Sequence, residues 1–281
     1  MKNIIVPVDL SANSAKALKV ANSLALKSKA KLIVFHHYSY SSAIISNVEP
    51  QIFDTLLSEL EIYVEKELKT FVKKHLGSLG NHILIKGVQG FGITDTLLEF
   101  AKKNKADLIV MGTQGASGLK RFVVGSYATQ TIKNSTVPVL VIPKNFKNNE
   151  FNKIGYSSDL AAIDKELSLF QLFAELTKAT IDIVHIEPLF PNPEAAKNFK
   201  PEEKLAHLHT KFPAIKFNYV PIKTKVANDF HGGINLYKRR HKPDLLVLIK
   251  HKRTWLDNIL NPSRTLDLAY QSKIPLLCIN A

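Results

Sequence analysis

Short apolar runs alternate with amphipathic stretches along the first half of the chain. Five runs rich in β-branched residues and leucine have the length of strands, at 4–8, 31–37, 82–87, 107–112 and 137–143. The stretch 11–29 between the first two runs has Ala15, Leu18, Ala21 and Ala25 at helical spacing. Continuous apolar strands that alternate with helices are typical of a parallel sheet covered on both faces. The pattern therefore predicts an α/β unit with five strands.

The remaining helices of this unit are expected at 51–76, 93–104 and 126–135. Polar residues at the helix starts are candidates for N-caps, because their side chains accept hydrogen bonds from free backbone N–H groups. Ser11 or Asn13 is expected to cap the first helix, and Thr94 is expected to cap the helix at 93–104.

The second half of the chain repeats this frame. Residues 106–143 align with 243–280 at a constant offset of 137, which brings Asp107 onto Asp244. Residues 4–37 resemble 154–187 at an offset of about 150, which matches Asp9 with Asp159 and His36 with His185. We therefore predict an α/β fold of two tandem doubly wound domains, each a five-stranded parallel sheet with helices on both faces. The domains are expected at 1–146 and 150–281, joined by a polar linker at 144–150.

Glycines gather between the fourth and fifth predicted strands, where open parallel sheets bind ligands. They are Gly112, Gly115, Gly118 and Gly125, and Ser126 follows the last directly. Glycine lets a backbone come close to a ligand, and the helix start at Ser126 suits a phosphate. The Ser126 hydroxyl is placed to donate to a phosphate oxygen or to reach Mg²⁺, and Lys120 and Arg121 add positive charge. The pattern matches neither the GxxxxGK[ST] phosphate loop nor GxGxxG, so it predicts a different polyphosphate site, with an ordinary surface loop as the alternative.

These residues carry a resemblance to a known family. The pattern Gly112-x2-Gly115-x9-Gly125-Ser126 resembles the nucleotide-binding signature of the universal stress protein family. Residues 6–18, VPVDLSANSAKAL, resemble the family's opening, and 106–115, ADLIVMGTQG, resemble its fourth strand and loop. The resemblance covers the chain as two tandem copies and is degenerate in the second. It implies a stress-response regulatory protein that binds ATP, or else ADP or AMP, with Mg²⁺.

The resemblance also implies which residues of the first copy hold the nucleotide: Pro7, Val8, Asp9, His37, Met111, Gly112, Gly115, Gly125, Ser126 and Tyr127. Asp9 is expected near the adenine and ribose, and the backbone of Pro7, Val8 and His37 is expected to line the adenine pocket. Gly112 is expected near the ribose and first phosphate, and Gly115, Gly125 and Ser126 near the later phosphates. His37 departs from the small aliphatic residue that the family usually has there.

The second copy has lost most of this signature. Ile249, Lys252 and Pro262 stand where the first copy has Gly112, Gly115 and Gly125, and Pro262 also lacks a backbone N–H. Only Ser263 remains, and we interpret it as a helix N-cap. Gly232-Gly233 aligns with a helix start, which favours a cap or loop role over ligand binding. We therefore expect one nucleotide site per chain and a structural second domain.

Composition narrows the alternatives. The formal charge of +14 comes from lysines spread over many helices, which favours solvated surfaces over nucleic-acid binding. The single Cys278, the absence of a signal-like N-terminus and the lack of long apolar runs lead us to expect a cytoplasmic protein with no membrane span. We expect no metal site in the protein itself, and His36 is interpreted as structural. No catalytic set of side chains is evident, so a slow ATPase and a scaffold that binds no nucleotide are the alternatives to a regulatory nucleotide-binding protein.

The last strands of the two copies suggest an assembly. Residues 137–143 and 274–280 are strongly apolar, and an open sheet edge made of either would invite aggregation. Pairing of the two would make an internal pseudo-dimer of the domains. The family resemblance implies dimers as well, so a homodimer is the other expected assembly.

Overall fold

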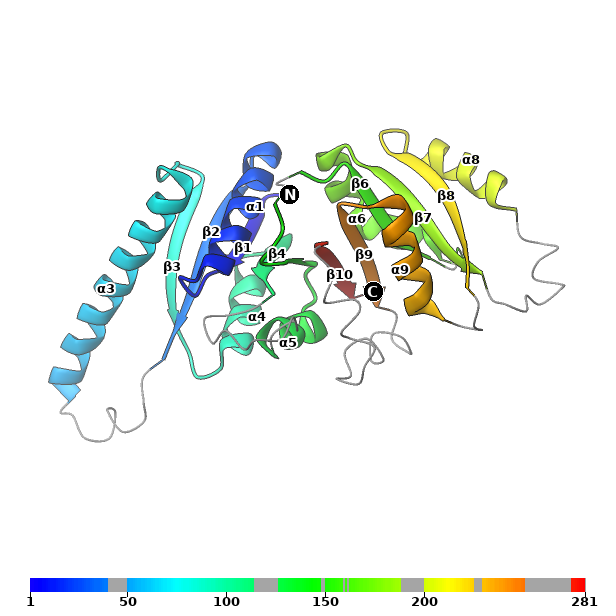
Figure 1. Ribbon diagram of the computed structural model, residues 1–281. Coiled ribbons are helices and arrows are strands. Elements are labelled where there is room, and N and C mark those ends of the chain that lie inside the picture. The colour runs from blue at the N-terminus through cyan, green and yellow to red at the C-terminus, as the bar shows by residue number, and fades with distance from the viewer. Residues whose placement is uncertain are drawn as a thin grey trace. The chain divides into compact units, whose positions relative to one another are not determined.

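The computed structural model describes residues 1–39, 50–113, 126–147, 150–158, 160, 162–187, 200–224, 229–250 and 274–280 (Figure 1). The chain divides into two compact units, with the change from the first to the second between Lys144 and Asn145. Within the described residues no helix is both long enough and apolar enough to cross a membrane.

The first unit is an open parallel sheet with helices on both faces (Figure 1). Its strands lie in the order β3-β2-β1-β4-β5, so the chain builds outward from β1 in one direction and then returns to the other side of β1. The strands are β1 (Asn3–Pro7), β2 (Lys31–Tyr38), β3 (Ile83–Gln89), β4 (Leu108–Gly112) and β5 (Val139–Ile142). The helices are α1 (Ala12–Ser28), α3 (Pro50–Leu76), α4 (Ile93–Lys103) and α5 (Ser126–Asn134).

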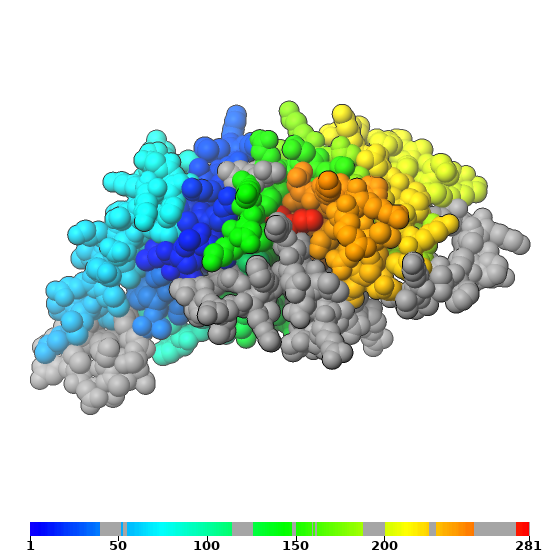
Figure 2. Space-filling view, in the orientation of Figure 1, coloured from blue at the N-terminus to red at the C-terminus, as the bar shows by residue number. Residues whose placement is uncertain are grey.

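The apolar runs of this unit fill its core. Ile4, Ile5 and Val6 of β1 are fully buried, as expected of a central strand with helices on both sides. Helix α1 contacts α3, and α4 contacts α5, so each face carries a helix pair. Helix α3, cyan in Figure 2, has a solvent-facing side on which Ile62 and Tyr63 are more than half exposed.

The second unit repeats this order of elements. Its strands lie in the order β10-β9-β6-β7-β8, and every pair is parallel. They are β6 (Lys153–Ser157), β7 (Thr180–Glu187), β8 (Lys216–Lys223), β9 (Leu245–Lys250) and β10 (Leu276–Asn280). The described helices are α6 (Ile163–Thr177), α8 (Pro201–Lys211) and α9 (Phe230–His241). The predicted fold class is therefore confirmed.

The predicted helix caps have mixed outcomes. Ser11 is the N-cap of α1, and its side chain accepts a hydrogen bond from the backbone N–H of Ser14 at 3.2 Å. The prediction for Thr94 was wrong, because α4 begins after Gly92 and has no side-chain cap. Thr94 instead lies buried in the first turn, where its hydroxyl contacts the side-chain oxygen of Gln130 on α5 at 3.2 Å.

In both units an aspartate side chain holds the start of the central strand by hydrogen bonds. In the first unit the Asp107 carboxylate accepts hydrogen bonds from the backbone N–H groups of Lys2 and Asn3. In the second, the aligned Asp244 accepts from the N–H groups of Asn152 and Lys153, at 2.9 and 3.0 Å. An aspartate just before the fourth strand thus fixes the start of the neighbouring first strand in each unit. Asp107 and Asp244, which align in the sequence, therefore also make the same contacts in the structure.

A left-handed residue turns the chain from the first strand of each unit into its first helix. Leu10 has φ 62° and Leu160 has φ 66°, although a side chain disfavours this conformation. Both units also have a histidine at the equivalent position of the second strand. A ring nitrogen of His36 on β2 bonds the Val8 carbonyl at 2.7 Å, and a ring nitrogen of His185 on β7 lies 3.3 Å from the Ser158 carbonyl. These contacts support the structural interpretation of His36.

The cores of the units differ in polarity at one position of the second strand. Ile33 of β2 is buried among apolar side chains, whereas the equivalent residue of β7 is the buried Asp182. The Asp182 carboxylate accepts hydrogen bonds from the Tyr237 hydroxyl and the Asn218 amide, both at 2.9 Å. Tyr237 aligns with Phe100 of the first unit, whose ring packs against Phe35.

Candidate functional site

A cavity of about 160 Å³ opens in the first unit at the carboxyl ends of its strands. It lies where the strand order reverses, between β1 and β4, which is where open α/β sheets bind ligands. Its lining comes from β1, β2 and β4, from the segments that follow them, and from α1, α4 and α5. The lining residues are Pro7, Val8, Asp9, Ser14, Phe35, His37, Ile93, Met111, Gly112, Thr113, Tyr127 and Ala128.

The turn after β1 fixes Asp9 at this cavity. One carboxylate oxygen of Asp9 accepts a hydrogen bond from the backbone N–H of Ser11 at 3.1 Å, which is a local turn typical of aspartate. The hydroxyl of Ser14 donates to the Ser11 carbonyl at 3.0 Å and lies 3.4 Å from the backbone nitrogen of Asp9. The start of α1 thus holds a carboxylate against the cavity wall.

His37 lines the cavity from β2. Its Nε2–H donates to the carbonyl of Gly90 at 2.9 Å, which fixes the imidazole against the loop between β3 and α4. His37 therefore has a defined partner in the protein, and the larger ring that departs from the family pattern is accommodated by this loop. Among the described residues no three His, Cys, Asp or Glu side chains are grouped so as to hold a metal ion.

Gly112 ends β4 beside the first turn of α1. A Cβ at this position would lie 2.6 Å from the side-chain nitrogen of Asn13 and 2.9 Å from its Cγ, far closer than ordinary contact. The sequence explained this glycine by the approach of a ligand. The structure gives a second reason, because the Asn13 side chain in the first turn of α1 occupies the space that a Cβ at this position would fill.

Tyr127 brings a buried hydroxyl to the cavity. It is the second residue of α5, and its hydroxyl oxygen is buried without a hydrogen-bond partner among the described residues. Burial, and secondarily the negative charge of Asp9, raises the pKa of Tyr127, so the phenol remains protonated at physiological pH. The cavity therefore presents a carboxylate that only accepts hydrogen bonds and a neutral hydroxyl that both donates and accepts.

Most of the predicted site residues that the structure describes meet at this cavity: Pro7, Val8, Asp9, His37, Met111, Gly112 and Tyr127 line it. Ser126 stands at the start of α5 with an exposed side chain. Gly115 and Gly125 lie outside the described residues, as do Gly118, Lys120 and Arg121. Ligand binding by these residues stays a prediction.

The sequence missed five lining residues, which are Ser14, Phe35, Ile93, Thr113 and Ala128. Phe35 and Thr113 are neighbours of predicted residues at strand ends, so the sheet topology alone would have indicated them. Ile93 and Ala128 come from helices α4 and α5, and sequence periodicity does not say how far each helix reaches over the strand ends.

The second unit has different chemistry at the equivalent positions. Ile249, which replaces Gly112, is a buried core residue at 3% exposure. The carboxylate of Asp229 accepts the N–H of Gly232 at 2.8 Å and caps α9, so Gly232 and Gly233 lie within the start of the helix and the cap or loop role predicted for them was wrong. Gly233 packs α9 onto Ile186, the equivalent of His37. Lys252, Pro262, Ser263 and Asp159 lie outside the described residues.

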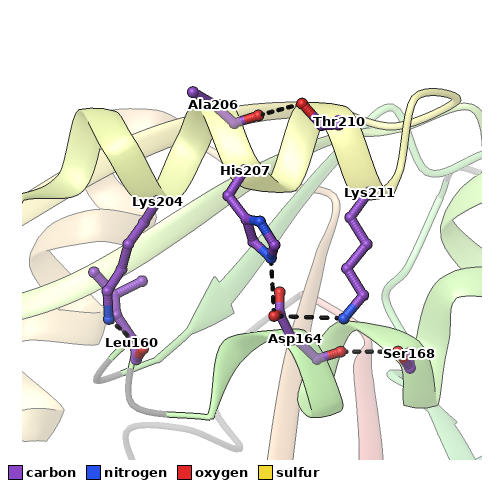
Figure 3. A network of polar contacts seen from close by, with 8 residues as sticks. All are labelled: Leu160, Asp164, Ser168, Lys204, Ala206, His207, Thr210 and Lys211. Atoms are coloured by element: carbon purple, nitrogen blue, oxygen red, sulfur yellow. Dashed lines mark hydrogen bonds and ion pairs between the residues drawn. The ribbon is translucent and has the colours of Figure 1, made fainter.

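A wider concavity of about 530 Å³ lies in the second unit between the start of α6 and helix α8. Figure 3 shows His207 and Lys211 of α8 pointing to Asp164 in the first turn of α6, with nitrogen–oxygen distances of 3.0 and 3.4 Å. Lys204 donates to the carbonyl of Leu160 at 2.7 Å. Desolvation raises the pKa of the Asp164 carboxyl, but the hydrogen bonds and charges of His207 and Lys211 outweigh it, so the pKa is lowered. These contacts fasten α8 to α6.

The first unit thus has the architecture of an open α/β protein whose pocket lies at the reversal of strand order. The sequence profile of the universal stress protein family matches residues 1–143. The chain therefore belongs to the universal stress protein family, a family of stress-response proteins.

Individual relatives agree with this assignment. A universal stress protein of Methanocaldococcus jannaschii is 36% identical over 143 residues, which are 51% of this chain and 82% of that protein. A second relative, from Bacillus subtilis, is 31% identical over 147 residues, which are 50% of this chain and 97% of that protein. The crystal structure of a universal stress protein from Archaeoglobus fulgidus covers 99% of this chain and 96% of its own, with a TM-score of 0.63 and 16% identity. That likeness concerns the fold alone.

Proposed function

We propose that this protein is a regulatory stress-response protein whose first unit binds an adenine nucleotide, which is ATP or else ADP or AMP, with Mg²⁺ bound through its phosphates. The observation that carries the proposal is the cavity at the ends of β1 and β4, lined by seven residues that the sequence nominated beforehand. Membership of the family adds weight to the glycine pattern 112–126, since the pattern lies within the matched residues 1–143.

The residues present fit a nucleotide in several respects. Pro7, Val8 and Met111 give the cavity apolar walls for a base. Asp9 and Tyr127 add polar groups that fix orientation. Ser126 begins α5, and the free N–H groups of a helix start favour phosphate. We assign no metal ligand to the protein beyond the Ser126 hydroxyl, and the second unit has a structural role in this proposal.

The first test is to denature the purified full-length protein and identify any released nucleotide by mass spectrometry, followed by titration calorimetry with Mg-ATP. We expect a released adenine nucleotide or saturable binding. At a ligand concentration of 100 times Kd, linkage predicts a stabilisation of about 2.7 kcal/mol in thermal melts. Photolabelling with 8-azido-ATP and peptide mapping should mark peptides from residues 1–39 or 108–134. Labels confined to 150–281, or no binding at millimolar nucleotide, would contradict the proposal.

Turnover separates regulation from a slow ATPase. If the protein is a regulator, bound ATP should stay intact over its bound lifetime, which time-resolved product analysis measures. The pairing of segments 137–143 and 274–280 into an internal pseudo-dimer also stays a prediction. Sedimentation of fragment 1–146 tests it, because self-association or insolubility is expected and a soluble monomer at high concentration would refute it.

A further inference from the structure

Lysines gather at the amino ends of the strands in the first unit. Its strands are parallel, so they all start at one end of the sheet, and the helices that return the chain also end there. The described helices α1, α3, α4 and α5 each have a lysine in their last turn. Lysines that are scattered along the sequence therefore meet at one end of the folded unit, and the cavity lies at the other end.

Four exposed lysines form a row across the starts of three adjacent strands. This lysine row consists of Lys2 before β1, Lys29 and Lys31 at the start of β2, and Lys105 before β4. The backbone N–H of Lys31 donates to the carbonyl of Lys2 at 2.8 Å, and Asp107, two residues after Lys105, accepts from the N–H of Lys2. Adjacent strands lie about 4.8 Å apart, so the row spans roughly 10 Å of the sheet.

Little negative charge balances the lysine row. Helix α1 and strands β1 and β2 contain no acidic residue. The carboxylate of Asp107 is held by the backbone N–H groups of Lys2 and Asn3, and Glu99 lies about one turn before the end of α4. Clustered like charges create a positive field that attracts polyanions.

Two lysines of the row have a backbone conformation that favours glycine. Lys29 has φ 54° and Lys105 has φ 47°, and this left-handed geometry costs a residue with a side chain roughly 1–2 kcal/mol. At the end of α1 the cap is made by the backbone N–H of Lys29, which bonds the Leu26 carbonyl at 3.3 Å. Glycine would supply the same N–H at lower cost, so capping does not explain the lysine side chain.

The second unit keeps this feature, although Gly112 of the site has become Ile249 there. Lys178 caps α6 as Lys29 caps α1, and Lys242 aligns with Lys105. Both again have positive φ, 54° and 48°, and both are exposed. Two exposed arginines in the last turn of α9 add further positive charge. The basic end thus occurs in both units.

The chemistry of this end suits phosphates more than an apolar partner. Leu26 is exposed in the last turn of α1, but one leucine offers little area for a membrane or for the core of a protein interface. The exposed aromatic residues Tyr63 and Phe91 lie in the middle of α3 and after β3, away from the strand starts. Proteins that bind single strands stack bases on aromatic rings, so a duplex, which presents its backbone, fits better.

We propose that the lysine row binds the phosphate backbone of a double-stranded nucleic acid without regard to its sequence. The sequence favoured solvated surfaces because the lysines are scattered along the chain, and the fold brings them together. Lysine ammonium groups bind backbone phosphates and release the counterions of the duplex. This inference is independent of the proposed nucleotide function, since the cavity lies at the opposite ends of the strands.

Fluorescence anisotropy with the full-length protein and a labelled random duplex DNA of about 25 base pairs tests the proposal over roughly 50–200 mM salt. One variant replaces the four lysines of the row by glutamine. A matched control replaces four exposed lysines away from the strand starts by glutamine, at Lys66, Lys86, Lys165 and Lys200. Wild type should bind with an affinity that falls steeply with salt. The row variant should bind more weakly, with a salt slope shallower by about one for each lysine that contacts a phosphate. The control should behave as wild type.

A glycine variant separates binding from capping. Lys29→Gly with Lys105→Gly should leave the melting temperature unchanged or raise it, because the left-handed geometry costs glycine less, and should still weaken duplex binding. No duplex binding by wild type at about 50 mM salt would overturn the proposal. So would an equal loss in the control, full affinity in the glycine variant, or binding of phosphatidylserine vesicles in place of the duplex. ATP titration of the row variant tests the nucleotide site separately, and its affinity for ATP should equal that of wild type.

Discussion

The two units share the contacts that hold their strands and turns, and they differ in the residues at the carboxyl ends of their strands. Asp107 and Asp244 fasten equivalent strands, Leu10 and Leu160 make the same left-handed turn, and a histidine follows at the same place on the second strand. At the site, by contrast, Gly112 has become the buried Ile249. Each of these framework hydrogen bonds joins backbone groups to one side chain that does not line the cavity, so it does not depend on which side chains line the cavity. A repeat can therefore change the residue at the end of its fourth strand and keep its fold.

The cores of the two units also differ, in the polarity of two buried side chains. The second unit places a carboxylate where the first has Ile33, and it also places a hydroxyl where the first has Phe100. A buried charge is tolerated when its hydrogen bonds are satisfied. Asp182 and Tyr237 therefore form one exchangeable set, and burial and the Asp182 charge both raise the pKa of the Tyr237 phenol and keep it protonated.

The largest loss of stability is expected when only one of Asp182 and Tyr237 is replaced by its counterpart from the first unit. Asp182→Ile should destabilise the protein by about 3 kcal/mol, because it removes two hydrogen bonds to a charged group and orphans the Tyr237 hydroxyl. The double variant Asp182→Ile, Tyr237→Phe should recover most of the loss. Denaturant unfolding measures both. A double variant as unstable as the single one would show that the two positions are not coupled.

A smaller effect is expected at the end of β4. Gly112→Ala should cost about 2 kcal/mol, because the new Cβ overpacks against Asn13. Asn13→Ala should reduce that cost by removing the amide in the way. Unfolding of the two single variants and the double variant measures the coupling. If Gly112→Ala is neutral, the contact with the Asn13 side chain does not explain this glycine.

The shared fastening should give equal effects in the two units. Asp107→Ala and Asp244→Ala are each expected to cost about 1 kcal/mol, since each carboxylate accepts two backbone N–H groups near the surface. Thermal melts of both variants make the comparison. A large loss of stability for one variant and none for the other would mean that the two aspartates have equivalent positions but contribute unequally to stability.

The smallest effect concerns the contact between α6 and α8. Asp164→Asn should lower the melting temperature slightly, because the carboxylate is partly exposed and its ion pairs are screened. The pKa of Asp164 is lowered in the folded state, so its contribution is present above its unfolded pKa and is lost as the pH falls through the folded pKa. Melts of wild type and variant should therefore converge at acid pH. A difference that persists there would point to packing rather than charge.

Much of the fold could be predicted because its strands are continuous apolar runs. Each predicted strand of the first unit overlaps an observed one, since central strands buried on both faces leave a signal that turns do not obscure. Thr94 shows where this reasoning fails. It has the chemistry of an N-cap, but α5 supplies Gln130 as a tertiary partner and the helix starts without a side-chain cap. Helix-capping propensity is read from neighbouring residues, whereas the contact with Gln130 joins two helices that are distant in the sequence.

The candidate site could be predicted where it depends on strand ends and not where it depends on helices. Asp9, His37 and Met111 were indicated by the family resemblance, and the parallel strands β1, β2 and β4 bring them to one cavity. The orphan hydroxyl of Tyr127 could not be foreseen, because its isolation depends on which neighbours fail to reach it. The role of Asn13 beside Gly112 was likewise hidden, since it requires the distance between a helix and a strand.

The turn at Leu10 and Leu160 offers a route to a more heat-resistant protein. Left-handed geometry costs a residue with a side chain roughly 1–2 kcal/mol, and glycine escapes most of it. Leu10 is 38% exposed, so a glycine there would release strain with little loss of packing. Leu160 is 3% exposed and would lose a core contact if it were exchanged. The same bend is thus an opportunity for engineering in one half of the chain and a site to leave alone in the other.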